Sequence, residues 1–123
     1  MAAEGKFDIK LTPQEDQDTP AGRMTILKDY SGDMVGIGVG QMISKRTAQG
    51  ASVYAAIEEF SGSLEGKQGS FTLFHNGFMT AEKQSLEVII VDGSGTGELS
   101  NIQGSLTIIQ ESGEHSYILN YQL

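Results

Sequence analysis

The segment His115–Leu123 reads HSYILNYQL, and its pattern decides the fold. Every second residue from Tyr117 to Leu123 is aromatic or aliphatic, and two of the three residues between them are polar. Because successive side chains of a β-strand point to opposite faces of the sheet, this alternation is typical of a strand with one buried face. The segment therefore predicts a strand whose inner face carries His115 and the two tyrosines.

Seven further segments indicate strands, since they are short, apolar on alternate residues and bounded by turn-forming residues. The chain has 16 glycines and only 2 prolines, a composition typical of many tight turns. Both prolines fall in segment 12–22, TPQEDQDTPAG, which is expected to be a loop. The expected strands are Phe7–Leu11, Arg23–Tyr30, Val35–Ile43, Ser52–Phe60, Gly69–His75, Ser85–Val91 and Gly104–Gln110.

Eight strands at short, regular spacing indicate an antiparallel meander. An open sheet of this kind would leave two unpaired edges, and closing it into a barrel removes both. We therefore predict an all-β fold, an eight-stranded antiparallel closed barrel, with a two-sheet sandwich as the alternative. The 123 residues match the usual size of one domain, so 1–123 is expected to form a single barrel domain. A chain that ends within a strand, at Leu123, also favours closure.

The charge balance narrows the choice of partners. The formal charge is −8, from 16 acidic and 8 basic residues. Nucleic acids and anionic membranes need a basic surface, so neither is expected as a partner. No apolar run approaches the ~18 residues of a membrane-spanning helix, and the opening MAAEGKFDIKL lacks the pattern of a signal peptide. The chain has no cysteine, hence no disulfide, and a cytoplasmic location is expected.

Three later segments resemble a known family. They are GSLEGKQGSFTLFHNG (Gly62–Gly77), DGSGTGELSNIQGSLTI (Asp92–Ile108) and GEHSYILNYQL (Gly113–Leu123). Together with YSGDMVGIG (Tyr30–Gly38), they resemble a bacterial family of uncharacterised proteins over about three quarters of the chain. That family is similar to the allene oxide cyclase barrel, an eight-stranded antiparallel barrel broadly like the calycin barrels of lipocalins. The resemblance implies the same fold as the strand pattern, and nothing specific about a substrate.

Two adjacent acids, Glu58 and Glu59, have opposite strand parity, so only one of them can face the interior. The strand pattern leaves both possibilities open, and the family resemblance favours Glu58. A carboxylate inside the barrel needs a histidine, a tyrosine or water as its partner. Burial tends to raise the pKa of such a group, which could then act as a general acid or base. His75 has the inward parity of Phe71, so Glu58 and His75 are the candidate catalytic pair.

Other polar side chains fall on faces that the pattern predicts to be inward, and a pocket with a few polar groups among apolar ones is typical of ligand sites. The expected ligand-binding residues are Gln41, Gln110, His115, Tyr117 and Tyr121. Two histidines 40 residues apart, without a suitably spaced carboxylate, predict no metal site. The glycine-rich GSGTG at Gly93–Gly97 precedes Glu98 and a strand, so it indicates a β-turn and no phosphate-binding cofactor loop.

Three functions remain open. The first is a barrel that binds a small apolar or amphipathic ligand in its mouth. The second is a cofactor-independent enzyme of the cyclase or isomerase type, with Glu58 or His75 moving a proton. The third is a non-catalytic assembly protein. Phe74, Ile89 and Val91 have outward parity, and outward apolar residues indicate a subunit interface, so a homodimer or homotrimer is expected.

Overall fold

Eight long strands and one short strand make up the protein, of which a computed structural model describes residues 1–15 and 18–123. No helix occurs among these residues, so none could span a membrane. The strands are β1 (Ala2–Gln14), β2 (Gly22–Gly32), β3 (Met34–Arg46), β4 (Ser52–Leu64), β5 (Lys67–Met79), β6 (Gln84–Ile90), β7 (Thr96–Gly97), β8 (Gln103–Glu111) and β9 (Glu114–Gln122).

The long strands close into one antiparallel barrel. Their order is β4-β3-β2-β1-β9-β8-β6-β5, and an additional pairing between β5 and β4 completes the circle. The first and last strands pair from Ala2 with Asn120 to Phe7 with His115. The predicted eight-stranded closed barrel is confirmed, and the two-sheet sandwich is excluded. The weakest seam lies between β6 and β8, where the register contains one residue pair, Ile89 with Ser105.

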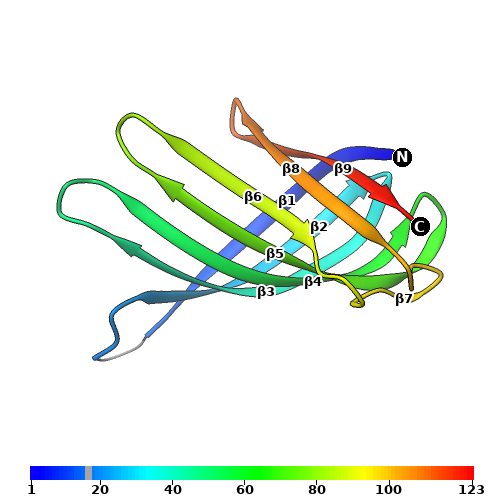
Figure 1. Ribbon diagram of the computed structural model, residues 1–123, viewed down its shortest axis with the longest axis horizontal. Coiled ribbons are helices and arrows are strands. Elements are labelled where there is room, and N and C mark those ends of the chain that lie inside the picture. Colours follow the sequence, from blue (N-terminus) through cyan, green and yellow to red (C-terminus); the bar gives the residue numbers. More distant parts are fainter. Residues whose placement is uncertain (16–17) are drawn as a thin grey trace.

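The two ends of the barrel differ (Figure 1). At one end lie both termini, the β2–β3 and β4–β5 turns, and the segment 91–103 that carries β7. Leu99 and Ile102 of this segment are fully buried and fill that end of the core. At the other end the β1–β2, β3–β4, β5–β6 and β8–β9 hairpins splay apart. We call these the closed end and the mouth.

Strand β3 has an unusual inner face, made of glycine. Gly36, Gly38 and Gly40 pair with the inward residues of β2, so the aliphatic residues of β3 point outward. A Cβ on Gly38 would collide with the Glu58 carboxylate, and it would also crowd the Tyr30 ring. Large side chains from β2 and β4 fill the interior here, and only glycine leaves room for them. Gln41, with the parity of the aliphatic residues, is therefore outward, and its predicted inward position is wrong.

Strand β1 runs further than the sequence predicts. It continues to Gln14, and its last residues pair with β2 from Thr12 with Thr25 to Gln14 with Arg23. The first part of the predicted loop 12–22 is therefore strand, and positions 16 and 17 of that loop lie outside the described residues. Pairing with β2 supplies hydrogen bonds that local turn composition does not reveal.

Candidate functional site

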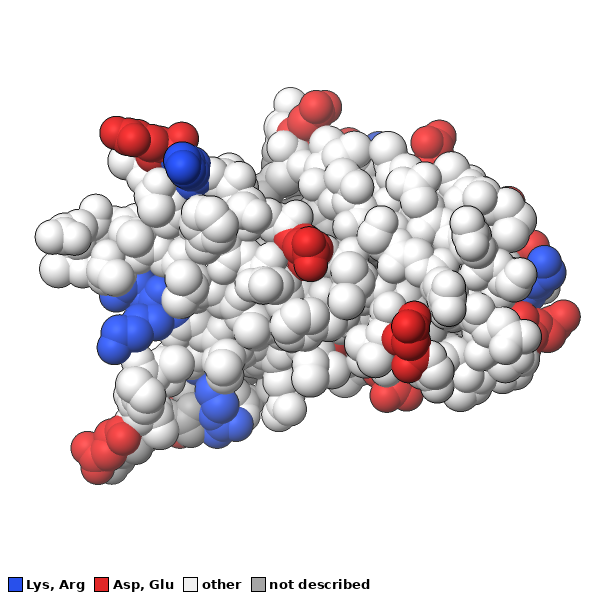
Figure 2. Space-filling view, viewed as in Figure 1, with Lys and Arg blue, Asp and Glu red and all other residues white. Residues whose placement is uncertain are grey.

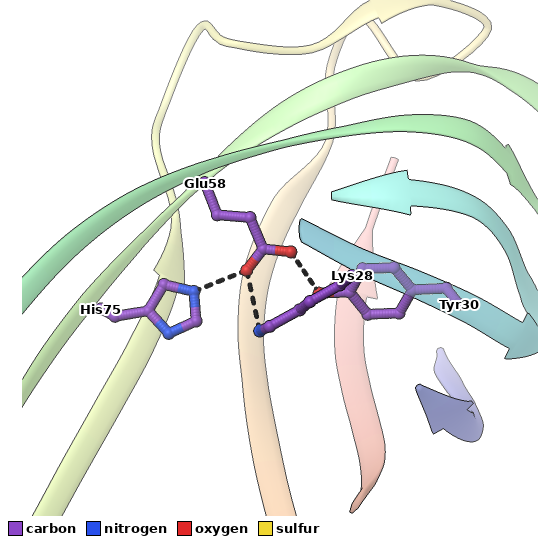
Figure 3. A network of polar contacts seen from close by, with 4 residues as sticks. All are labelled: Lys28, Tyr30, Glu58 and His75. Atoms are coloured by element: carbon purple, nitrogen blue, oxygen red, sulfur yellow. Dashed lines mark hydrogen bonds and ion pairs between the residues drawn. The ribbon is translucent and has the colours of Figure 1, made fainter. Parts of the chain in front are cut away.

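Four polar side chains meet inside the barrel. Lys28 and Tyr30 come from β2, Glu58 from β4 and His75 from β5, and their side chains converge on the Glu58 carboxylate (Figure 3). All four residues are buried, with exposures of 3% for Lys28, 2% for Tyr30, 0% for Glu58 and 4% for His75. The strand pattern left open which of the two adjacent acids faces inward. The structure places Glu58 inside, whereas Glu59 is exposed on the outer face.

Three donors surround this carboxylate. Lys28 Nζ lies 2.9 Å from Oε1, and His75 Nε2 lies 2.8 Å from the same oxygen. The Tyr30 hydroxyl donates to Oε2 over 2.5 Å. Within the described part of the chain, no buried side-chain nitrogen or oxygen lacks a hydrogen-bond partner. The charged groups therefore satisfy one another, as buried ions must.

Aromatic rings hold the site in place. The Lys28 ammonium lies 4.6 Å from the centre of the Phe7 ring, a distance typical of a cation–π contact. The Tyr30 ring makes edge contacts with Phe60 and with Tyr117, at centroid distances of 5.3 and 5.6 Å. These contacts restrict the rotamers of Lys28 and Tyr30, so the donors are held in place before any ligand arrives.

The Glu58 carboxylate is ionised. Burial alone would raise its pKa, but the hydrogen bond from His75, the charge of Lys28 and the hydrogen bonds from Tyr30 and Lys28 outweigh burial. Together they lower the pKa of Glu58 from the usual 4.5 to about 2. The predicted raised pKa of a buried glutamate is therefore wrong, because three donors compensate the lost water. Burial, and then the neighbouring Glu58 charge, raises the pKa of Tyr30, which stays a neutral donor.

An ionised Glu58 determines which ring nitrogen of His75 carries the proton. A carboxylate only accepts hydrogen bonds, so Nε2 is the protonated nitrogen that donates to it. In the neutral ring, Nδ1 then holds a lone pair. No hydrogen bond to Nδ1 occurs among the residues that the structure describes. The arrangement makes Nδ1 the atom of the cluster that can accept a proton or a hydrogen bond from a bound molecule.

The mouth above this cluster is apolar and open to solvent. From His75, β5 continues through Gly77 to the mouth, and the Tyr54 ring packs over Gly77, where a Cβ would strike it. Four apolar residues on the inner faces at this end remain exposed by 36% to 45%: Ile9, Leu11, Met79 and Leu86. The rim of the mouth is therefore exposed and apolar, whereas the polar cluster below it is buried.

Basic residues gather around the mouth. Of the eight lysines and arginines, five lie on the mouth halves of the strands or in the mouth hairpins: Lys10, Arg23, Lys45, Arg46 and Lys83. Figure 2 shows most of the visible blue side chains at this end, although the chain as a whole is acidic. A sixth basic group, Lys28, lies inside the barrel.

The two tyrosines predicted to bind a ligand lie at the closed end. The Tyr117 hydroxyl accepts a hydrogen bond from the Met34 backbone N–H over 2.8 Å and donates to the Ser31 carbonyl over 2.9 Å. The Tyr121 hydroxyl lies 2.5 Å from Glu65 Oε1, and burial together with this contact raises the pKa of Tyr121 to about 12. Both hydroxyls brace turns, so the structure does not bring these tyrosines together with His75 at the mouth.

The other predicted ligand residues are scattered. Gln41 lies on the outer face and is exposed. Gln110 and His115 pair with each other near the β8–β9 turn, where Gln110 is exposed and His115 is half-buried. The His115 ring packs against Phe7, with centroids 5.2 Å apart. His115 therefore lies at the side of the mouth, one aromatic ring away from Lys28.

Sequence reasoning missed Lys28 and Tyr30. A detectable signal was present, because both residues share the parity of Ile26 within the expected strand Arg23–Tyr30. A lysine on the apolar face of a strand predicts a buried partner of opposite charge. That partner is Glu58.

No group of three or more histidines, cysteines or acids suited to a metal occurs among residues 1–15 and 18–123. The GSGTG segment forms turns next to β5. Ser94 donates to the Val91 carbonyl over 2.6 Å and accepts from the Thr72 backbone N–H over 3.0 Å. The Ser94 hydroxyl therefore stabilises the turn and its contact with β5.

Comparisons with known proteins agree with this fold. The model of a family described as "Protein of unknown function (DUF3224)" matches residues 3–121. A solved structure of a DUF3224 protein of unknown function from Shewanella oneidensis MR-1 is similar, with a TM-score of 0.93 and 38% sequence identity. The similarity covers 99% of this chain and 96% of that chain. No curated protein matches. The expected resemblance to a bacterial family of uncharacterised proteins is confirmed.

Proposed function

The chain belongs to the DUF3224 family of proteins of unknown function, and we propose that its barrel binds a small apolar or amphipathic molecule in the mouth. The observation that carries the proposal is a buried, ionised cluster below a rim of exposed apolar side chains on the inner faces of the strands. Buried ion pairs contribute little to stability, since apolar residues of similar volume do as well or better. Stability alone therefore does not explain the cluster of Lys28, Glu58 and His75, and we infer that it has a role in function.

The mouth offers two kinds of contact to such a ligand. Apolar side chains such as Leu11 and Leu86, exposed by 45% and 38%, would gain by burial against a hydrocarbon group. Below them, His75 Nδ1 is free to accept a hydrogen bond from a polar end of the ligand. A predominantly apolar site with a few fixed polar groups is the usual composition of a small-molecule pocket. The mouth hairpins carry acids such as Glu15, Glu82 and Glu111 beside the basic residues, so the charges of the rim do not select the sign of the head group.

A nuclear magnetic resonance titration would test this proposal. The probes are decanoate, decanol and decyltrimethylammonium, which share one hydrocarbon chain and differ in the charge of the head. We expect saturable shifts of the backbone amides of Ile9, Leu11 and Leu86, with decanol, whose hydroxyl can donate a hydrogen bond to His75 Nδ1, binding more tightly than decyltrimethylammonium, which has no donor. Absence of saturable shifts with all three probes, or shifts confined to the outer face, would refute the proposal.

A matched pair of variants supports the titration. Leu86→Gln places a polar group on the inner face of the mouth and should weaken decanoate binding. Ile118→Gln makes the same change on the half-buried outer side of β9, away from the mouth, and should leave binding unchanged. Equal loss of binding in both variants would show that the probe does not enter the mouth.

A second function is favoured by the contact between His75 and Glu58. We propose that, if the ligand is a substrate, His75 is the proton-transferring group and Glu58 is its positioning residue. An ionised carboxylate that holds Nε2–H and leaves the other ring nitrogen as a base is the arrangement of many acid–base enzymes. Nitrogen-15 spectra should show the Nε2–H tautomer of His75 at neutral pH. A dominant Nδ1–H tautomer would exclude this role.

A likeness to the allene oxide cyclase barrel would be consistent with such proton transfer, but it is an analogy of fold and does not name a substrate. The cytoplasmic location stays a prediction.

A further inference from the structure

The outside of β3 and β4 is unusually apolar. Six aliphatic residues there, which we call the outer apolar face, are each 49% to 61% exposed: Val35, Ile37, Val39, Ile43, Val53 and Ile57. All six are β-branched residues of a kind normally placed in a core, and the middle of the inner side of the same β3 strand is glycine. The usual inside–outside pattern of this strand is therefore inverted.

The outer apolar face extends across neighbouring strands. Val39 pairs with Leu27 of β2, which is 49% exposed. Val53 pairs with Phe78 of β5, which is 43% exposed. Ile57 pairs with Phe74, which in turn pairs with Ile89 of β6. These pairings connect the apolar residues into one area. The area includes Phe74 and Ile89, which the sequence predicted to form an interface on β5 and β6, but its centre lies on β3 and β4.

The size of this area matches what a stable dimer needs. The outer apolar face and its neighbours Leu27 and Phe78 are eight residues, each about half exposed. They present on the order of 700 Å², close to the roughly 800 Å² that each partner contributes to a standard interface. Apolar patches on monomers seldom exceed about 300 to 600 Å². From this agreement in area, we infer that the outer apolar face binds a second copy of this chain in a two-fold dimer.

The distribution of charge fits association between two identical acidic chains. A chain of net charge −8 repels its own copy least where the contact carries no excess of negative charge. None of the six residues of the face is charged, and their charged cross-strand neighbours are two acids and two bases. Asp29 pairs with Ile37, Glu59 with Val39, Arg23 with Ile43 and Lys45 with Val53. An apolar centre with a polar rim of both signs is the usual make-up of a homodimer interface.

The face has both grooves and a projecting side chain. Two grooves of about 250 and 460 Å³ share Ile43 and Ala55 as lining residues, because Ala55 is too small to fill the space between its neighbours. Ile57, two residues away on the same strand, is the most exposed residue of the face at 61%. In a two-fold contact each groove meets a projecting side chain of the other copy.

Strand-edge pairing is a poorer route to a dimer. Each long strand is hydrogen-bonded on both sides within the described residues, apart from the sparsely paired β6–β8 seam. Face-to-face packing of β3 and β4 therefore remains the way to cover the apolar area.

Sedimentation velocity of the purified protein at about 1 to 100 µM would test the inference, since dissociation constants of this range are typical of weak to moderate homodimers. The wild-type protein should sediment with twice the 13.2 kDa of one chain. Val39→Lys should raise the dimer dissociation constant at least ~100-fold, because it places a long charged side chain, next to Glu59, within the apolar contact.

Thr107→Lys, on the exposed outer side of β8, is the matched control and should leave the dimer intact. Ile57→Asp is a second variant that should also give monomers, and circular dichroism would show that each variant keeps its β-structure. Two results would overturn the inference. One is a wild-type protein that is still monomeric at about 100 µM, and the other is a dimer that persists in both Val39→Lys and Ile57→Asp. None of these outcomes depends on ligand binding at the mouth.

Discussion

The closed end and the mouth are built from the same eight strands but use their inner faces differently. At the closed end, Leu99 and Leu119 are fully buried and the Tyr117 hydroxyl is bonded to backbone groups. At the mouth, Leu11 and Leu86 keep 45% and 38% of their surface exposed on inward-facing positions. The cluster around Glu58 lies where the filled part of the barrel meets the open part. The comparison indicates that one end supplies stability and the other leaves room for function.

The largest effect is expected at the boundary between the two ends. Glu58→Gln removes the countercharge of Lys28, whose side chain is only 3% exposed. The substitution should lower the unfolding free energy by about 3–5 kcal/mol. The double variant Lys28→Met, Glu58→Leu removes both charges but leaves the Tyr30 and His75 donors without their acceptor, so it should recover only part of this loss. Urea unfolding measures both. A double variant as unstable as Glu58→Gln would show that the pair itself, and not an unpaired charge, sets the stability.

A matched leucine pair compares the two ends directly. Leu99→Ala leaves a cavity in the closed end and should lower the unfolding free energy by about 2–5 kcal/mol, whereas Leu86→Ala at the mouth should cost less than about 1 kcal/mol. Leu99 is 0% exposed and Leu86 is 38% exposed. Thermal or urea unfolding of the two variants measures both losses of unfolding free energy. Equal losses would mean that the mouth is as tightly packed as the core.

The acid stability of the protein should report the state of Glu58. The pKa of Glu58 is about 2 in the folded protein and 4.5 when unperturbed, so the unfolded chain takes up this proton first as the pH falls. The stabilisation is therefore fully present above about pH 4.5 and lost as the pH falls toward 2, with a total of about 3 kcal/mol.

Urea unfolding at pH values from about 6 down to about 2.5 measures most of this loss, since the loss begins near pH 4.5 and continues toward pH 2. Glu58→Gln should show a flatter profile than wild type over the window, and the exposed Glu59→Gln should keep the wild-type slope. Identical profiles for Glu58→Gln and wild type would contradict an ionised Glu58.

The smallest effect is expected from a single hydroxyl at the closed end. Tyr117→Phe removes the bonds to the Met34 N–H and the Ser31 carbonyl and should cost about 1–2 kcal/mol. It should leave decanoate binding at the mouth unchanged, because Tyr117 lies below the polar cluster. Denaturant unfolding measures the loss of unfolding free energy, and the decanoate titration measures the affinity at the mouth. Weaker binding without a change in stability would place Tyr117 in the ligand site after all.

Much of the site could be predicted from the alternation of inward and outward residues, when it is applied to every strand. Alternation placed His75 on the inner face of β5, and the resemblance favoured Glu58 over Glu59. The same alternation around Lys28 predicts a buried lysine, which pairs with Glu58 at 2.9 Å. What alternation could not predict was the ionisation of Glu58, because that depends on three donors from two other strands meeting at one carboxylate.

The sequence by itself determined the eight strands, because the period of two is a local property that each strand carries independently of its neighbours. It favoured closure over a two-sheet sandwich, and the pairing of β1 with β9 decided between them. Only the tertiary structure decided which face of β3 is inside. Hydrophobicity alone would turn Val35, Ile37 and Val39 inward, but the space there is already taken by Tyr30 and Glu58, and Gly38 is the residue that fits beside them. The volume available inside a barrel is a property of all its strands together, so no single strand can predict it.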